Sequence, residues 1–174
     1  MAGAFMLKRR ASWFAVVTLG AALCGCGHSS STRTPSSTGT AARSTMSAGD
    51  VPSDMVSAVS PGGSATPIAM KFRLTTPPVV GSPVQVDVAL IPATDVAISH
   101  IHATFSPGDG LQVQSDRNVD ITDPRPGEVV VQTVTVVPQQ VGVLSLTATV
   151  LVELDTGSIA RTYTVPLIAV PPAS

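Results

Sequence analysis

The sequence predicts an all-β fold, an antiparallel β-sandwich of about seven strands that occupies residues 67–174. Three observations lead to this fold class. From Pro67 onward, apolar and polar residues alternate in short runs, and Gly and Pro residues separate these runs. No run has the 3.6-residue period of an amphipathic helix. Several short strands spread over roughly 100 residues are typical of a sandwich.

The first three strands show the alternation most clearly. The first has apolar residues at every second position, namely Ile68, Met70, Phe72 and Leu74. The second repeats the pattern and stops at Pro92: Val84, Val86, Val88 and Leu90. The third directs three apolar residues inward: Ile101, Ala103 and Phe105. Successive side chains of a strand point to opposite faces, so we expect each strand to bury one face.

Three further strands follow the turn at residues 107–110. Residues 111–114 form a short fourth strand, and residues 119–122 form a fifth. Residues 129–137 form a longer strand whose inward face stays open, because both sets of alternate positions carry valines.

The last two strands are predicted as a hairpin. Residues 144–154 alternate strictly, and Asp155-Thr156-Gly157 is typical of a short connection into residues 159–170. Pro166 has no backbone N–H to donate, so we expect this final strand at a sheet edge or at a bulge.

The predicted domain contains few aromatic residues, so its core must consist of β-branched aliphatic side chains. Its strand pattern over residues 67–170 resembles the immunoglobulin-like modules of bacterial envelope proteins. In contrast to antibody-type domains, it has neither the two core cysteines nor a tryptophan. Strand order and sandwich subfamily therefore stay open.

The N-terminus has the layout of a secretory signal. Lys8, Arg9 and Arg10 precede the uncharged stretch 11–23. Its 13 residues are fewer than the roughly 20 that cross a bilayer as a stable helix. A cleaved signal therefore explains this stretch better than a permanent membrane-spanning helix.

Leu23-Cys24-Gly25-Cys26 resembles the lipobox of bacterial lipoproteins. The resemblance implies that residues 1–25 are a signal peptide and that Cys26 receives a diacylglycerol. It further implies that the new N-terminus receives an acyl chain such as palmitate. Two or more chains anchor a protein firmly, whereas one chain is marginal. The alternative is an ordinary cleaved signal that happens to contain two cysteines.

Residues 26–66 are predicted to be a disordered tether. They are rich in Ser, Thr, Ala, Gly and Pro, and they offer too little apolar surface to offset the entropy of ordering. A stalk that carries O-linked sugars is the alternative for this composition.

Composition excludes several functions. After cleavage before Cys26 the chain keeps 7 basic and 11 acidic residues, and this charge argues against nucleic-acid binding. With Cys26 as the only remaining cysteine, no intramolecular disulfide can form. The nucleophile elbow, the Ser-x-x-Lys pair and the phosphate loop of common enzyme classes are missing from the sequence.

Two histidines form the most site-like pattern. His100 and His102 lie two residues apart on a predicted strand, so both rings project from one face with Cα atoms about 6.5–7 Å apart. Such a pair can supply two ligands to copper or zinc. Asp95 and Asp109 are possible companions in adjacent loops. The alternative is a polar face that happens to carry two histidines.

A second polar pattern is the stretch DRNVDITD, with oxygen-bearing side chains at Asp116, Asn118, Asp120 and Asp123. Calcium loops have oxygen ligands at alternate positions. The stretch departs from an EF-hand because Ile121 replaces the required glycine and Gly127 replaces the final glutamate. A soluble turn is the simpler interpretation.

These observations favour a membrane-anchored envelope lipoprotein that acts as a non-enzymatic binding or structural accessory module. We expect it to have no cofactor, to be held by an N-terminal lipid, and to contact another envelope protein through a strand edge or sheet face. In an organism with two membranes, the outer membrane facing the periplasm is the expected location. The alternative function is a periplasmic copper- or zinc-binding lipoprotein that uses His100 and His102.

Overall fold

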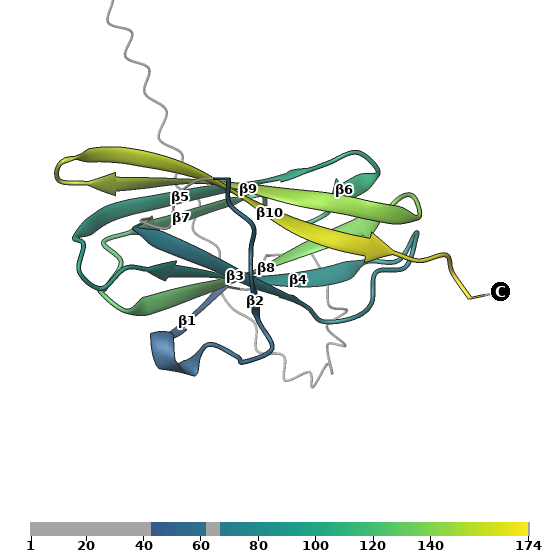
Figure 1. Ribbon diagram of the computed structural model, residues 1–174, viewed down its shortest axis with the longest axis horizontal. Coiled ribbons are helices and arrows are strands. Elements are labelled where there is room, and N and C mark those ends of the chain that lie inside the picture. The colour runs from purple at the N-terminus through teal and green to yellow at the C-terminus, as the bar shows by residue number, and fades with distance from the viewer. Residues whose placement is uncertain (1–42, 62–66, 174) are drawn as a thin grey trace, which may run out of the picture. The chain divides into compact units, whose positions relative to one another are not determined.

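The computed structural model describes residues 43–61 and 67–173, which form two antiparallel β-sheets facing one another (Figure 1). The six-stranded sheet has the order β1-β8-β4-β3-β2, and β6 also pairs with β8. Its strands are β1 (Arg43–Ser47), β2 (Val56–Ser57), β3 (Ile68–Leu74), β4 (Val84–Pro92), β6 (Leu111–Val113) and β8 (Glu128–Pro138). The four-stranded sheet has the order β10-β9-β5-β7. Its strands are β5 (Ile98–Pro107), β7 (Asn118–Thr122), β9 (Gly142–Leu154) and β10 (Gly157–Ala169).

The space between the sheets is filled by the alternating apolar residues, which confirms the predicted all-β sandwich. The inward residues of β3, β4, β5 and β9 are buried in one cluster, and Phe105, Ile68 and Leu146 are among its largest fully buried members. Tyr163 reaches across this core, and its hydroxyl donates a hydrogen bond of 2.6 Å to the carbonyl oxygen of Ile68.

Strand β8 is buried on both faces, which explains why its sequence showed no preferred inward side. Val134 and Val136 point into the space between the sheets. Val129 and Val131 point to the opposite side, where a second small apolar cluster covers them. A strand that is covered on both faces has no reason to alternate.

The N-terminal segment, residues 43–61, provides this cover. It lies within the stretch 26–66 that was expected to be a disordered tether, so the structure differs from that expectation. Strand β1 pairs with β8, a 3-10 helix η1 (Ala48–Asp50) follows, and β2 pairs with β3. Three apolar side chains of the segment, Met46, Val51 and Met55, pack on the outer face of the six-stranded sheet, whereas Val56 and Val59 are exposed. Local composition did not predict this, because these side chains bury little surface against one another. They bury it against strands that lie far away in the sequence.

Polar contacts also hold the N-terminal segment in place. The Nε of Arg73 donates to Asp87 at 3.0 Å, and its Nη1 lies 3.3 Å from Asp54 of the segment. Asp87 is buried and accepts a second hydrogen bond of 2.7 Å from the hydroxyl of Thr133. The hydrogen bond with Asp87 is the main reason that the pKa of Arg73 is raised above its ordinary value.

Hydrogen bonds connect the two sheets at both lateral edges of the sandwich. On one side, Arg43 of β1 donates from Nη1 to the backbone oxygen of Asp120 in β7 at 3.0 Å, and from Nε to the buried Gln132 at 3.4 Å. On the other side, the backbone groups of Val59 and Thr164 form a reciprocal pair of hydrogen bonds, which joins the N-terminal segment to β10.

Strand β10 is the edge strand that Pro166 predicted, and it pairs with β9 along its whole length. The two strands form the expected hairpin, in which Leu154 is opposite Gly157. Gly157 has a φ of 138°, a conformation that side-chain-bearing residues rarely adopt. The described part of the chain contains no helix that is long and apolar enough to cross a bilayer.

Candidate functional site

His100 and His102 lie on the outer face of the four-stranded sheet, as their spacing predicts. Ile101, Ala103 and Phe105 of the same strand are fully buried, so the alternate positions must point outward. The two histidine side chains are 29% and 39% exposed, and solvent therefore reaches both rings.

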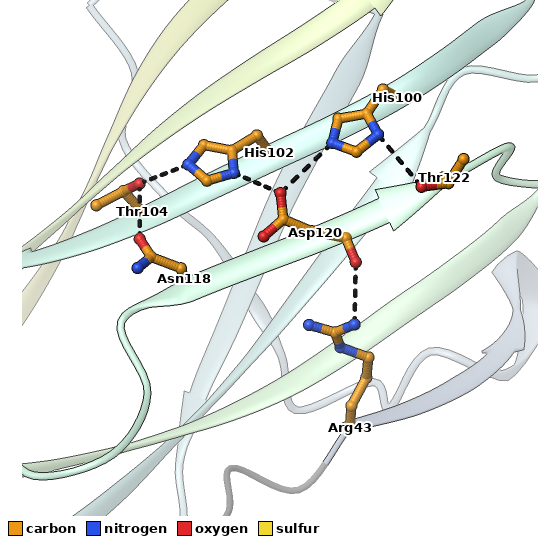
Figure 2. Close-up of polar contacts among 7 residues, drawn as sticks. All are labelled: Arg43, His100, His102, Thr104, Asn118, Asp120 and Thr122. Atoms are coloured by element: carbon orange, nitrogen blue, oxygen red, sulfur yellow. Dashed lines mark hydrogen bonds and ion pairs between the residues drawn. The ribbon is translucent and has the colours of Figure 1, made fainter. Parts of the chain in front are cut away.

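Asp120 of the neighbouring strand β7 joins the two rings. Its register partner in β5 is His102, which places the carboxylate between the two histidines. One carboxylate oxygen, Oδ1, lies 2.7 Å from Nδ1 of His102 and 3.4 Å from Nε2 of His100 (Figure 2). The sequence identified each of these three residues, but it gave no sign that β7 pairs with β5 in this register.

Hydroxyl and amide groups extend this arrangement on both sides (Figure 2). The hydroxyl of Thr104 lies 3.1 Å from Nε2 of His102 and donates to Oδ1 of Asn118 at 3.1 Å. The hydroxyl of Thr122 lies 3.4 Å from Nδ1 of His100. Every ring nitrogen of the pair therefore has a polar neighbour.

The carboxyl group of Asp120 is stabilised in its ionised form. The hydrogen bond with His102 is the main cause, and it lowers the pKa of Asp120 below its ordinary value of 3.8. Desolvation acts in the opposite direction but is the smaller influence. The site thus presents a carboxylate with two imidazole rings beside it on an open sheet surface.

This arrangement offers nitrogen and oxygen donors of the kind that bind copper or zinc. Within residues 43–61 and 67–173, however, no three His, Cys, Asp or Glu side chains are placed together so as to hold a metal ion. The hydrogen bonds of the two histidines lead to Asp120, Thr104 and Thr122, and neither Asp95 nor Asp109 is among these partners. Metal binding at His100 and His102 stays a prediction.

The Asp-rich stretch is divided between a loop and a strand. Residues 118–122 form β7, so Asn118 and Asp120 contact β5 and do not close into a loop around an ion. Asp123 begins the next turn with a φ of 49°, and its backbone N–H donates to Ser99. The interpretation of this stretch as a soluble turn with a short strand fits these contacts.

Sequence reasoning missed a patch of exposed aliphatic residues at one end of the domain. Its members and their exposed fractions are Val141 (59%), Val143 (77%), Ile168 (68%) and Val170 (44%). Val143 and Ile168 are register partners on the outer faces of β9 and β10, so the patch is continuous across two strands. Val141 and Val143 precede the predicted strand 144–154, and Ile168 and Val170 end the next one, so these residues gave no signal before their pairing was known.

A surface depression in the described part of the chain lies elsewhere. It has a volume of about 350 Å³, is widely open, and is lined by residues of β1, by the β7–β8 loop with Arg125, and by Glu128 at the start of β8. Neither histidine is among its lining residues. Cys26, the predicted lipidation site, lies outside the described residues.

No family model and no curated protein matches the chain. Among solved structures, the chain is similar to the GAE domain of GGA2p from Saccharomyces cerevisiae. The TM-score is 0.46 at 12% identity, over 67% of this chain and 99% of that domain.

Two bacterial β-sandwich domains are also similar. One is the cohesin module of a family 33 glycoside hydrolase from Clostridium perfringens, with a TM-score of 0.37 and 14% identity over 59% of this chain and 96% of that one. The other is AggA, the major subunit of aggregative adherence fimbriae type I from Escherichia coli. Its TM-score is 0.36 at 12% identity, over 62% of this chain and 97% of that one. At such low sequence identity, these similarities bear on the fold alone.

Proposed function

We propose that the chain is a membrane-anchored envelope lipoprotein whose sandwich domain is a non-enzymatic binding or structural accessory module. The observation that carries the proposal is a difference between the two sheets. The N-terminal segment covers part of the outer face of the six-stranded sheet and buries Ala89, Val129 and Val131 there. On the four-stranded sheet, none of the regularly alternating outward residues of β5, β7, β9 and β10 is buried.

The uncovered face is suited to a protein partner. Register places Thr104, Thr149 and Thr162 side by side across three strands, and Ser106, Thr147 and Thr164 form the next row. These short side chains make a broad hydroxyl-bearing surface beside His100 and His102. The hydroxyl groups of such a surface can donate and accept hydrogen bonds with a partner.

The anchor is supported by the sequence. The basic cluster, the short apolar stretch and the lipobox-like residues 23–26 together favour lipid attachment at Cys26. Attachment would confine the domain to the membrane surface, where a partner in the same envelope meets it at high effective concentration. We propose the periplasmic side of an outer membrane as the location in an organism with two membranes.

The proposal is tested by photo-crosslinking in intact cells. A crosslinking amino acid at Thr149 probes the uncovered face, and one at Gln85, which is exposed on the outer face of the six-stranded sheet, is the matched control. A single recurrent partner captured from Thr149, but not from Gln85, is expected. The Cys26→Ala variant should lose this capture because it is no longer anchored. Equal capture from both positions, or capture that survives loss of the anchor, would contradict the proposal.

Copper or zinc binding is the second candidate function, and the convergence of His100 and His102 on Asp120 favours it. A metal ion would replace the protons that join the rings to the carboxylate. Titration of the mature protein with each metal alone should give binding that the His100→Ala/His102→Ala double variant loses. The Thr149→Ala variant is the control on the same face. Binding that is unchanged in the double variant would exclude this site.

A further inference from the structure

One end of the sandwich is apolar and nearly free of charge. Backbone hydrogen bonds join the connections at this end: Gly81 donates to Pro138, Gln139 to Gly110, and Val80 to Val170. The connecting residues 75–83, 108–110, 139–141 and 170–173 contain one charged side chain, Asp109, and the nearby β6–β7 connection, residues 114–117, adds the opposite charges of Asp116 and Arg117. The exposed patch of Val141, Val143, Ile168 and Val170 lies at this end, which we call the apolar end.

The opposite end carries much of the charge. Its connections hold Asp50 in η1, Asp95 between β4 and β5, Asp123 and Arg125 between β7 and β8, and Asp155 in the β9–β10 turn. Residues 43–173 contain six basic and eleven acidic residues, so their formal net charge is −5. A negatively charged membrane surface would repel the acidic residues of this end, whereas it would not repel the apolar end.

The direction of β1 shows from which end the preceding chain arrives. Strand β1 runs antiparallel to β8, and its residues 43–47 are opposite residues 132–128. Since β8 ends at Pro138 in the apolar end, β1 runs away from that end. The C-terminus leaves the domain at the same end, and the β9–β10 hairpin marks the other (Figure 1). Within β1, Arg43, where the described part of the chain begins, therefore lies nearest the apolar end.

The distance to the proposed lipid is short. Seventeen positions separate Cys26 from Arg43. If these residues have the random-coil dimensions that their composition predicts, they would span roughly 20–25 Å, which is less than the ~40 Å length of the 13-residue strand β9. A domain tethered this closely must spend much of its time against the bilayer, and its entry strand directs the apolar end toward it.

From these observations we propose that the apolar end docks on the lipid surface, with the patch of Val141, Val143, Ile168 and Val170 in the headgroup region. This inference rests on the proposed lipid anchor at Cys26. Transfer of aliphatic side chains out of water lowers the free energy of the system. Four such residues bind a membrane only weakly, and the lipid supplies the high local concentration that makes this weak binding effective. The docked orientation keeps the hydroxyl rows and the histidines above the membrane, where a partner reaches them.

An environment-sensitive fluorescent amino acid tests the docking. It is placed at Gln140, which is exposed beside Val141, or at Thr156, which is exposed in the turn at the charged end. The full lipidated chain is reconstituted into vesicles of phosphatidylethanolamine and phosphatidylglycerol. Emission from position 140 should shift to the blue relative to detergent-free solution, and emission from position 156 should not.

A double variant checks the role of the patch. In Val143→Asp/Ile168→Asp both changes fall on highly exposed side chains, so the thermal unfolding of the variant should match the parent. The variant should still float with the vesicles through its lipid, while the blue shift at position 140 is lost. A blue shift that survives the double variant, or one that appears equally at position 156, would overturn the proposal.

Two arms separate this proposal from that of the anchor. The mass of the N-terminal peptide from envelope-purified protein reports whether Cys26 is lipidated. In the second arm, Cys26 of the mature chain is coupled to a maleimide lipid in the same vesicles, so docking is tested even when natural lipidation fails. An unshifted position 140 in this arm refutes docking. A concentration-dependent shift without vesicles would assign the patch to a second copy of the chain and refutes docking as well.

Discussion

The outer faces of the two sheets differ in what covers them, although both sheets belong to one sandwich. The six-stranded face is apolar at Ala89, Val129 and Val131, and it is covered by residues 43–61. The four-stranded face carries serine, threonine and histidine, and it is open. Burial of apolar residues on both sides of a strand stabilises the domain, whereas an open polar face contributes little stability. The comparison assigns stability to the covered face, and the open face is the one proposed for recognition.

The largest loss of stability is expected from a substitution of Met55, the most buried apolar side chain of the N-terminal segment. Met55→Ala leaves a cavity against the outer face of the six-stranded sheet and should lower the free energy of unfolding by about 2–5 kcal/mol. Thr149→Ala on the open face is the control, and it should stay within about 0.5 kcal/mol of the parent. Chemical denaturation measures both. Equal effects of the two substitutions would remove the distinction between the faces.

A smaller effect is expected at Arg73, which links the covered face to its cover. Arg73→Met leaves the buried carboxylate of Asp87 without its ion pair and should cost about 1–3 kcal/mol of unfolding free energy. Asp54→Asn removes only the exposed partner and should cost less than about 1 kcal/mol. If both substitutions have the same effect in chemical denaturation, the buried pair is not what holds the segment.

The open face should show a pH-dependent contribution from Asp120. Its pKa is lowered in the folded protein, so its ionised form adds stability at pH values above the ordinary 3.8. This contribution is lost as the pH falls through the lowered pKa. The stability difference between the parent and Asp120→Asn should therefore be present just above pH 3.8 and vanish in stronger acid. Denaturation curves over a pH series measure it, and a difference that grows on acidification would have the wrong sign.

The smallest effect on stability is expected for substitutions in the hydroxyl rows. Thr149→Lys/Thr162→Lys changes only outward, exposed side chains and should leave the unfolding midpoint unchanged. The same variant should lose the partner that the parent captures in cells, because two charges now occupy the proposed contact surface. If the variant still captures the partner, the recognition surface must lie elsewhere on the domain.

Alternation was sufficient to predict the strands of the core, because β3, β5 and β9 each bury one face against the opposite sheet. It failed where a strand is covered on both sides, as in β8, and where a short segment relies on distant partners, as in residues 43–61. Met46 and Met55 look isolated in a polar sequence, and only the sheet beneath them makes them part of a core. Local composition therefore underestimates order in a segment that packs on a finished fold.

The candidate site was predicted only in part for the same reason. The outward direction of His100 and His102 followed from the burial of Ile101, which a single strand reveals. The position of Asp120 between them depends on the register of β7 against β5, and no feature of either strand specifies that register. The exposed pair Val143 and Ile168 likewise became a patch only through strand pairing.

The entry of the chain through β1 also has a mechanical consequence. A pull from the membrane on Arg43 acts lengthwise along β1, in the direction opposite to its course beside β8. Such a force shears all the β1–β8 hydrogen bonds together, whereas a force at right angles would open them one at a time. The guanidinium of Arg43, which also contacts β7, distributes part of the load to the second sheet. With the proposed anchor and partner, tension between them would act on β1 in shear, which resists force better than opening the strand pair from one end.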